Sequence, residues 1–211
     1  LNLPEMRLYY FPRPKQGEQP VVITHPVSIG RMDWETPMGM TKIVAKKVDP
    51  TWTPPQSLKE EALADGEVLP DVVPAGPDNP LGRYAMRLGV PGYLIHSTNK
   101  PWGVGMRVTH GCVRMYPEDI ESLFDDVSPG TPVQIINQPI KAGWLDGTLY
   151  LEVHPPLAED GVKYGDITQV AMDAISDAIS EENTKYQVML RDRAIKTAID
   201  EQNGIPVAIS R

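Results

Sequence analysis

A lone cysteine in a glycine-containing turn is the residue of this sequence whose chemistry is most specific. Cys112 directly follows His110 and Gly111, and His96 ends a predicted strand sixteen residues earlier. Cysteine attacks as a thiolate, and a nearby imidazole generates the thiolate by accepting the proton. Gly111 permits a tight turn in which the amides of Gly111 and Cys112 point at one oxygen, as in an oxyanion hole. The pattern predicts acyl transfer through Cys112, with His96 as the base.

Other interpretations of these residues stay open at this point. A lone thiol can be an inert buried side chain. His96, His110 and Cys112 are all zinc-ligand types, but the sequence has neither a C-x-x-C nor an H-x-x-x-H pair, so we predict no metal. His110 is also a second candidate base, although its spacing from Cys112 favours a structural or amide-donating role.

Length and charge limit the classes of protein to consider. The 211 residues, of which 41% are hydrophobic, suit one medium domain or one domain with an appendage. A net charge of −8 argues against nucleic acid as a partner, because such binding relies on Lys and Arg at the phosphates. No stretch approaches the roughly 20 apolar residues that cross a bilayer. Since the sequence starts at Leu1, we expect a processed or trimmed product, and any signal peptide or lipid anchor lies outside the sequence.

Short strands separated by prolines dominate the first three quarters of the chain. Their residues are aromatic or β-branched and partly alternate between apolar and polar. Asp146 and Gly147 predict a hairpin turn. We expect a long proline-rich loop over 50–80, and loops of that length in compact domains are usually functional. The predicted strands are 6–11, 19–29, 40–48, 83–88, 92–96, 132–137 and 148–154.

Two parts of the sequence have helical periodicity. Pro117 opens a short helix after the cysteine, and apolar residues then recur at i, i+3 and i+4. From about Tyr164 the same spacing predicts one long helix or two, packed on the β domain. We therefore predict a catalytic domain over 1–157 and a helical C-terminal extension over 158–211.

The run Thr109-His110-Gly111-Cys112-Val113-Arg114, together with His96, resembles the L,D-transpeptidase catalytic domain of the YkuD type. The resemblance extends over about residues 5–157. A spacer of twelve residues between His96 and Thr109, and an arginine at 114, resemble the periplasmic Gram-negative branch of that family. The other stretches that carry the resemblance are Thr36-Pro37-Met38-Gly39, Pro50-Thr51-Trp52, Pro77-Asp78-Asn79-Pro80-Leu81-Gly82-Arg83-Tyr84 and Tyr116-Pro117-Glu118-Asp119-Ile120.

The resemblance implies a mainly β fold, a β-sandwich, whose active site is partly covered by a lid. It implies that Cys112 attacks the carbonyl of an L-to-D bond in a peptidoglycan tetrapeptide stem and that His96 deprotonates it. The carbonyl of Ser97 would orient the imidazole, and the amides of His110, Gly111 and Cys112 would hold the oxyanion. D-Alanine then leaves, and an amine resolves the acyl-enzyme without a cofactor. Stretch 50–80 is our candidate lid.

We also single out residues that bind the substrate. Arg114 and Arg107 suit the carboxylates of a stem peptide, because guanidinium binds carboxylate bidentately. Their alternative is a structural ion pair with an acid such as Asp78 or Glu118. Trp102 lies in the loop between base and nucleophile, where it lines the substrate channel or only packs. Thr109 completes the set of substrate-binding candidates.

The sequence leaves open the acceptor of the acyl group and the choice between transfer and hydrolysis. The acceptor amine can belong to a second stem peptide, to an outer-membrane lipoprotein or to a D-amino acid, and we expect a periplasmic location. A thiol hydrolase, either an L,D-carboxypeptidase or an amidase that releases lipoprotein from peptidoglycan, would use the same residues with water as acceptor. From another class, a wall-binding module would leave Cys112 idle.

Overall fold

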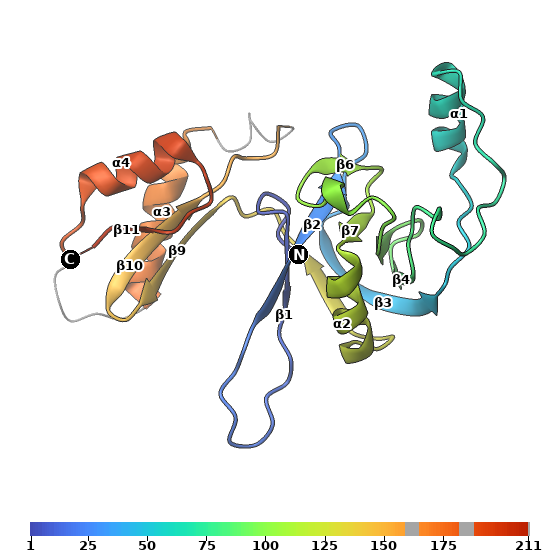
Figure 1. The fold of residues 1–211 in the computed structure, drawn as a ribbon. Coiled ribbons are helices and arrows are strands. Elements are labelled where there is room, and N and C mark those ends of the chain that lie inside the picture. Colours follow the sequence, from blue (N-terminus) through green and yellow to red (C-terminus); the bar gives the residue numbers. More distant parts are fainter. Residues whose placement is uncertain (159–164, 182–187, 211) are drawn as a thin grey trace. The chain divides into compact units, whose positions relative to one another are not determined.

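The structure is a computed structural model that describes residues 1–158, 165–181 and 188–210. The chain forms two compact units. The first contains Leu1 and Met6–Ile136, and the second contains Asn2–Glu5 and Asn137–Arg211 (Figure 1). This division falls earlier than the predicted boundary between 157 and 158, because the strands after residue 139 pair among themselves and pack under the C-terminal helices.

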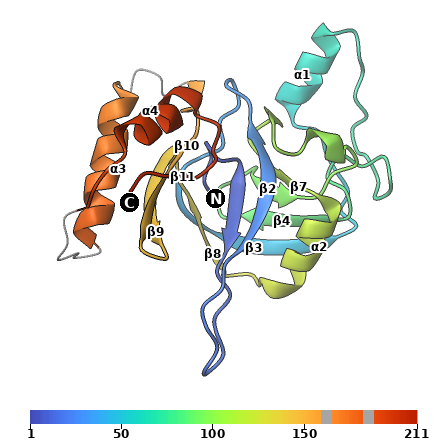
Figure 2. The ribbon, with the colours of Figure 1, turned by 60° about the vertical axis from the view of Figure 1, so that its left-hand side comes forward.

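The first unit is built on an eight-stranded sheet. Its order is β1-β2-β7-β5-β4-β3-β8, and β6 pairs with β2. Helix α2 (Pro117–Asp126) packs against β4 and buries Ile120, Leu123 and Phe124 (Figure 2). The strands are β1 (Arg7–Tyr10), β2 (Ile23–Gly30), β3 (Gly39–Val48), β4 (Tyr84–Leu88), β5 (Leu94–His96), β6 (Arg107–Thr109), β7 (Val113–Met115) and β8 (Pro132–Ile135).

The predicted mainly β class is confirmed, and the sandwich arrangement stays a prediction. The helix expected after the cysteine is present as α2. A 3-10 turn, η1 (Pro101–Gly103), lies between β5 and β6.

The stretch 50–80 is more ordered than the long loop expected from its prolines. It contains helix α1 (Gln56–Ala64), and Trp52 forms an isolated β-bridge with Val73. Asn79 is fully buried, and its amide donates to the carbonyls of Pro50 at 2.8 Å and Pro74 at 3.0 Å. One asparagine side chain therefore fastens the two ends of the stretch together.

The second unit is a three-stranded sheet, β11-β10-β9, that packs with two helices. Its strands are β9 (Ile140–Leu145), β10 (Thr148–Val153) and β11 (Val207–Ala208), and its helices are α3 (Ile167–Glu181) and α4 (Asp192–Glu201). Asp146 and Gly147 have positive φ angles of 48° and 75°, so the predicted hairpin turn is present between β9 and β10. Tyr164, where the predicted helical run begins, lies outside the described residues.

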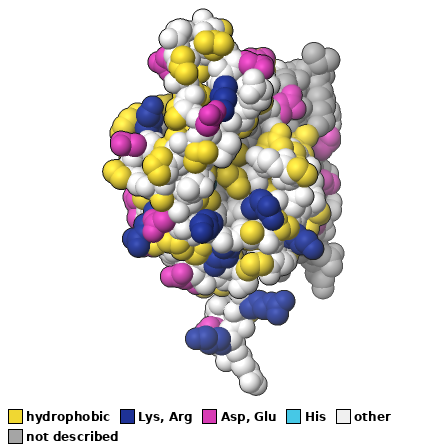
Figure 3. Space-filling view, turned by 90° about the vertical axis from the view of Figure 1, so that its right-hand side faces the viewer, with side chains coloured by type: hydrophobic (Ala, Val, Ile, Leu, Met, Phe, Trp, Pro, Cys, Tyr) yellow, Lys and Arg dark blue, Asp and Glu magenta, His cyan; other side chains and the backbone are white. Residues whose placement is uncertain are grey.

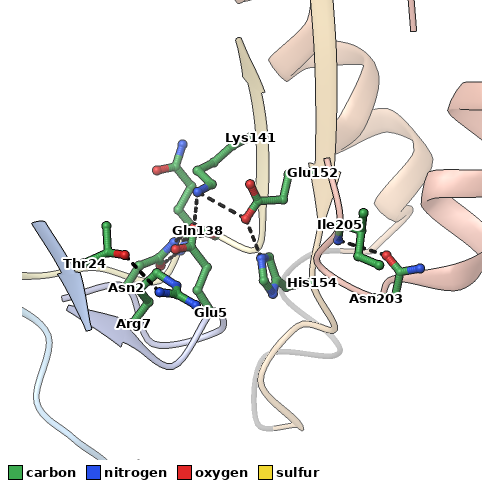
Figure 4. A network of polar contacts seen from close by, with 10 residues as sticks. All are labelled: Asn2, Glu5, Arg7, Thr24, Gln138, Lys141, Glu152, His154, Asn203 and Ile205. Carbon is green, nitrogen blue, oxygen red and sulfur yellow. Dashed lines mark hydrogen bonds and ion pairs between the residues drawn. The ribbon is translucent and has the colours of Figure 1, made fainter. Parts of the chain in front are cut away.

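Charges around the buried carboxylate of Glu5 compensate one another in the second unit (Figure 4). The side chain of Glu5 is 1% exposed, and its carboxylate lies 2.6 Å from Nζ of Lys141. The same ammonium lies 3.3 Å from Glu152, which also contacts Nε2 of His154 at 2.7 Å. Buried charges persist when they are paired in this way, so we interpret the cluster as structural.

Candidate functional site

Neighbouring parallel strands place His96 and Cys112 close together. His96 ends β5, and Cys112 directly precedes β7. In the β5–β7 register, Ile95 is opposite Val113 and His96 is opposite Arg114. Since side chains alternate along a strand, His96, Arg114 and Cys112 face the same side of the sheet.

The imidazole of His96 is oriented and kept neutral by its surroundings. Its Nδ1 lies 2.6 Å from the carbonyl oxygen of Ser97, so Nδ1–H donates and Nε2 is left as a proton acceptor. Burial and then the positive charge of Arg114 lower the pKa of His96 from 6.5 to about 4, while the bond to Ser97 opposes this shift. At neutral pH, the imidazole of His96 is therefore neutral, and its Nε2 is able to accept a proton.

The thiol of Cys112 also favours its neutral form. Its Sγ lies 3.7 Å from the carbonyl oxygen of Gly92. Burial raises the pKa of Cys112, although a backbone hydrogen bond from Leu94 and the charge of Arg114 act in the opposite direction. Because the resting pair is thiol and imidazole, a thiolate at Cys112 would have to be generated by proton transfer to a base.

Arg114 is a half-buried cation without a partner of its own. Among the described residues its guanidinium forms no ion pair and no hydrogen bond, and its buried Nε is unsatisfied. Within the described residues, Arg114 therefore does not form the structural ion pair with Asp78 or Glu118 that was the alternative interpretation. Gly103 of η1 faces the guanidinium, since a Cβ there would lie 3.3 Å from Nη1. Arg114 is suited to an anionic group of a ligand.

The turn before Cys112 has the backbone form that an oxyanion hole requires. Gly111 has a φ of +93°, and a Cβ there would lie 2.6 Å from the ring of Tyr93. The amides of His110, Gly111 and Cys112 have no hydrogen-bond partner within the described ranges. Thr109 is 3% exposed, and its hydroxyl donates to the Cys112 carbonyl at 2.6 Å. This geometry favours a positioning role for Thr109 over the predicted contact with substrate.

His110 directs its ring to helix α1. Its Nε2 lies 2.8 Å from Oε2 of Glu61, and Trp34 packs against the ring in a T-shaped contact at 5.1 Å. The other oxygen of Glu61 is ion-paired with Arg31. Since this ring is engaged with Glu61, His96 is the better placed base.

The remaining predicted residues lie around this centre. Nε of Arg107 donates to the carbonyl of Gly30 at 3.2 Å, so this guanidinium has at least one structural contact. Trp102 is 74% exposed on η1. Neither position decides between packing and substrate contact, and their binding roles stay predictions.

The sequence analysis missed two side chains that contact the turn that carries Cys112, Thr36 and Glu61. Thr36 belongs to a motif that the resemblance singled out, but its hydrogen bond to the Gly111 carbonyl joins residues far apart in the sequence. Glu61 was hidden in the stretch interpreted as a loop. Helix-forming residues after Pro54-Pro55 were the signal available for α1.

Comparisons with known sequences show the family of this chain. A family model described as YkuD, L,D-transpeptidase catalytic domain, matches residues 1–135. The chain is 42% identical to the probable L,D-transpeptidase YbiS of Escherichia coli K12, over 100% of this chain and 67% of the relative. It is 39% identical to the probable L,D-transpeptidase YcfS of the same strain, over 100% of this chain and 65% of the relative. This chain belongs to the YkuD family of L,D-transpeptidase catalytic domains.

The predicted family and enzyme class are thereby confirmed. The chain spans about two thirds of the length of these relatives. Among solved structures, the catalytic domain of an Enterococcus faecium L,D-transpeptidase matches with a TM-score of 0.45 and 22% identity, over 64% of this chain and 93% of that chain. None of the described helices is long and apolar enough to cross a membrane.

Proposed function

We propose that this YkuD-family protein transfers the acyl group of a peptidoglycan tetrapeptide stem to an amine through a thioester on Cys112. The observation that carries the proposal is the alignment of base and nucleophile on adjacent strands. His96, neutral and oriented by Ser97, lies on the same side of the sheet as Cys112, beside the unpartnered cation of Arg114. An idle thiol in a wall-binding module would need none of these features.

The chemistry follows from the protonation states of the site. Nε2 of His96 accepts the proton of Cys112 as Sγ attacks the carbonyl of the bond between the third and fourth residues of the stem. The amides of the Gly111 turn receive the developing oxyanion. When the C–N bond breaks, His96 returns the proton to the departing D-alanine amine, which leaves a thioester. An acceptor amine then attacks this thioester, passes its proton through His96 to the sulfur, and restores the thiol.

Arg114 is suited to hold a carboxylate of the donor stem. It is half-buried next to Cys112 and Gly103, and its charge acts on both His96 and Cys112. A bidentate guanidinium–carboxylate pair would fix the position of the stem relative to Sγ. The positive charge also stabilises the thiolate as it forms.

Amine rather than water is our proposed acceptor. Bulk water is abundant, so an amine succeeds only when the protein positions it, and good positioning is equivalent to effective molarities of about 10⁵ M or more. The stretch 50–80, fastened at its base by Asn79 and tied to the catalytic turn through Glu61, is the segment suited to that task. The side of the molecule on which α1 lies carries hydrophobic side chains among charges of both signs (Figure 3).

The test uses the purified protein with a tetrapeptide donor and a labelled amine. Mass spectrometry should find amine-exchanged or cross-linked product in excess of free tripeptide. Acceptors to compare are a second stem peptide, D-amino acids and a lipoprotein C-terminal lysine peptide, all of which a periplasmic enzyme would meet. If tripeptide dominates with every acceptor, the protein is a thiol hydrolase. A carbapenem, which is a strained amide, should add once to the protein. An adduct that persists in Cys112→Ala would contradict the assignment of Cys112 as the nucleophile.

A further inference from the structure

The hydroxyl of Thr36 lies between two backbone segments behind the catalytic turn. The N–H of Gly30 donates to Oγ1 at 3.0 Å, and Oγ1 lies 2.9 Å from the carbonyl oxygen of Gly111. Thr36 is 6% exposed. A hydroxyl has one proton, and the Gly30 amide only donates, so the proton of Thr36 must point to the Gly111 carbonyl. The direction of this hydrogen bond is therefore fixed by its partners.

Fixing the Gly111 carbonyl also fixes the amide of Cys112. Both groups belong to one planar peptide unit, in which the C=O and the N–H point in opposite directions. With its oxygen held by Thr36, this peptide directs the Cys112 N–H away from Thr36. That N–H has no partner among the residues the structure describes, as an amide that waits for an oxyanion must. The neighbouring peptide is fixed separately by Thr109, whose hydroxyl donates to the Cys112 carbonyl.

Gly111 needs such an external constraint. A glycine with a φ of +93° has no side chain to restrict its rotation. The segment that supplies Thr36 is packed closely on the turn, because a Cβ at Gly30 would lie 3.0 Å from Cα of Gly111 and 1.9 Å from the carbonyl oxygen of Trp34. Close approach at Gly30 thus brings the Thr36 hydroxyl within reach of the turn.

We propose that Thr36 is a positioning residue that aims the Cys112 amide into the oxyanion hole. The inference rests on the proposed function of Cys112, but it concerns a different step from generation of the thiolate. Through the Cys112 amide, Thr36 affects the substrate oxygen that gains negative charge during acylation. It contacts neither the sulfur of Cys112 nor His96. Its loss should therefore slow reactions that develop an oxyanion and spare reactions of the thiol that do not.

Two reagents separate these reactions on the intact chain. A carbapenem acylates Cys112 by forming an S–C bond and breaking the lactam C–N bond through an oxyanion. Iodoacetamide alkylates the same sulfur by displacing iodide, with no oxyanion. In Thr36→Val we expect acylation to slow by about 10- to 100-fold, part of the effect of removing one oxyanion donor, with alkylation and its pH profile unchanged. Thr36→Ser should restore acylation.

Controls keep the outcome decisive. Thr131→Val removes another hydroxyl that accepts from a backbone amide, that of Ser128 at 3.1 Å, and should change neither reaction. Thr36→Ala serves if Thr36→Val does not fold, as judged by thermal unfolding. Equal loss of acylation and alkylation, or no loss of acylation, would overturn the role of Thr36. Failure of the unaltered protein to react at Cys112 with carbapenem or donor would instead overturn the proposed function.

Discussion

The turn that carries Cys112 and helix α1 belong to the same unit, but different kinds of contact hold them in place. The turn is fixed by buried hydrogen bonds from Thr36 and Thr109 to its backbone. Helix α1 has no buried residue and no side-chain cap at its start. It reaches the turn through Glu61, whose side chain is 38% exposed and contacts Arg31 and His110.

This difference indicates which part can move without loss of chemistry. Buried hydrogen bonds are costly to break, because each leaves an unsatisfied polar group. Exposed ion pairs contribute little to stability and weaken with salt. We infer that the turn keeps one geometry throughout the reaction, whereas α1 can open to admit substrates and close over them. Changes to the turn or to His96 should therefore lower the rate of acyl transfer strongly. Changes to Glu61 should alter the choice between amine and water only weakly.

The largest effect is expected when His96, the proposed base, is removed. His96→Gln should lower turnover by about 100- to 10,000-fold, the usual cost of losing a general base. His110→Gln is the matched control, since its ring contacts Glu61 and should have a much smaller effect. Steady-state rates with a tetrapeptide donor measure both, and thermal unfolding checks that each variant folds. Turnover that survives in His96→Gln but is abolished in His110→Gln would reverse the assignment of the base.

A second effect concerns stability rather than rate. The pKa of His96 is about 4 in the folded protein and 6.5 when unperturbed, so the unfolded chain binds this proton more readily. Stability from this residue is fully present above pH 6.5 and is lost as pH falls toward 4. The full shift corresponds to about 3 kcal/mol. Urea unfolding at several pH values should show this slope, and His96→Gln should reduce it; an equal slope in both proteins would contradict the buried, neutral imidazole.

The same contrast explains which features the sequence could predict. Strand 40–48 and strand 83–88 were placed almost as β3 (Gly39–Val48) and β4 (Tyr84–Leu88) are found, because local patterning determines them. Strands β6 and β7 were missed, since three residues carry no periodicity. His96 and Cys112 could be named from residue type and spacing. The bond from Thr36 to Gly111 could not, because it spans 75 positions and exists only after the sheet has formed.

Helix α1 was missed for a different reason. Prolines around it dominate the composition of the stretch 50–80, while the nine residues Gln56–Ala64 consist largely of good helix formers. The extent of this helix could therefore be predicted from local residue types, but its contacts with the rest of the unit could not. Glu61 contacts Arg31, which lies 30 positions away in the sequence, and His110, which lies 49 positions away.

The smallest effect is expected when the contacts of Glu61 with Arg31 and His110 are weakened. Glu61→Gln should loosen α1 and raise the share of the acyl-enzyme that is hydrolysed by about two- to fivefold, the scale of an exposed ion pair. Alkylation of Cys112 by iodoacetamide should not change, because the turn keeps its buried hydrogen bonds. Glu60→Gln is the matched control: it removes the same charge from the same helix, but Glu60 contacts Gln56 within α1.

Acid should imitate the Glu61 substitution. The hydrogen bond from Arg31, and then that from His110, lowers the pKa of Glu61, so the contact is present above that pKa and is lost as pH falls through it. The ratio of tripeptide to amine-exchanged product should thus rise at the acid end in the unaltered protein and stay high at every pH in Glu61→Gln. High salt should raise the ratio in the unaltered protein for the same reason, since screening weakens an exposed pair. A ratio equal in the two proteins at all pH values would mean that α1 does not govern the choice between amine and water, and that the turn selects the acceptor without it.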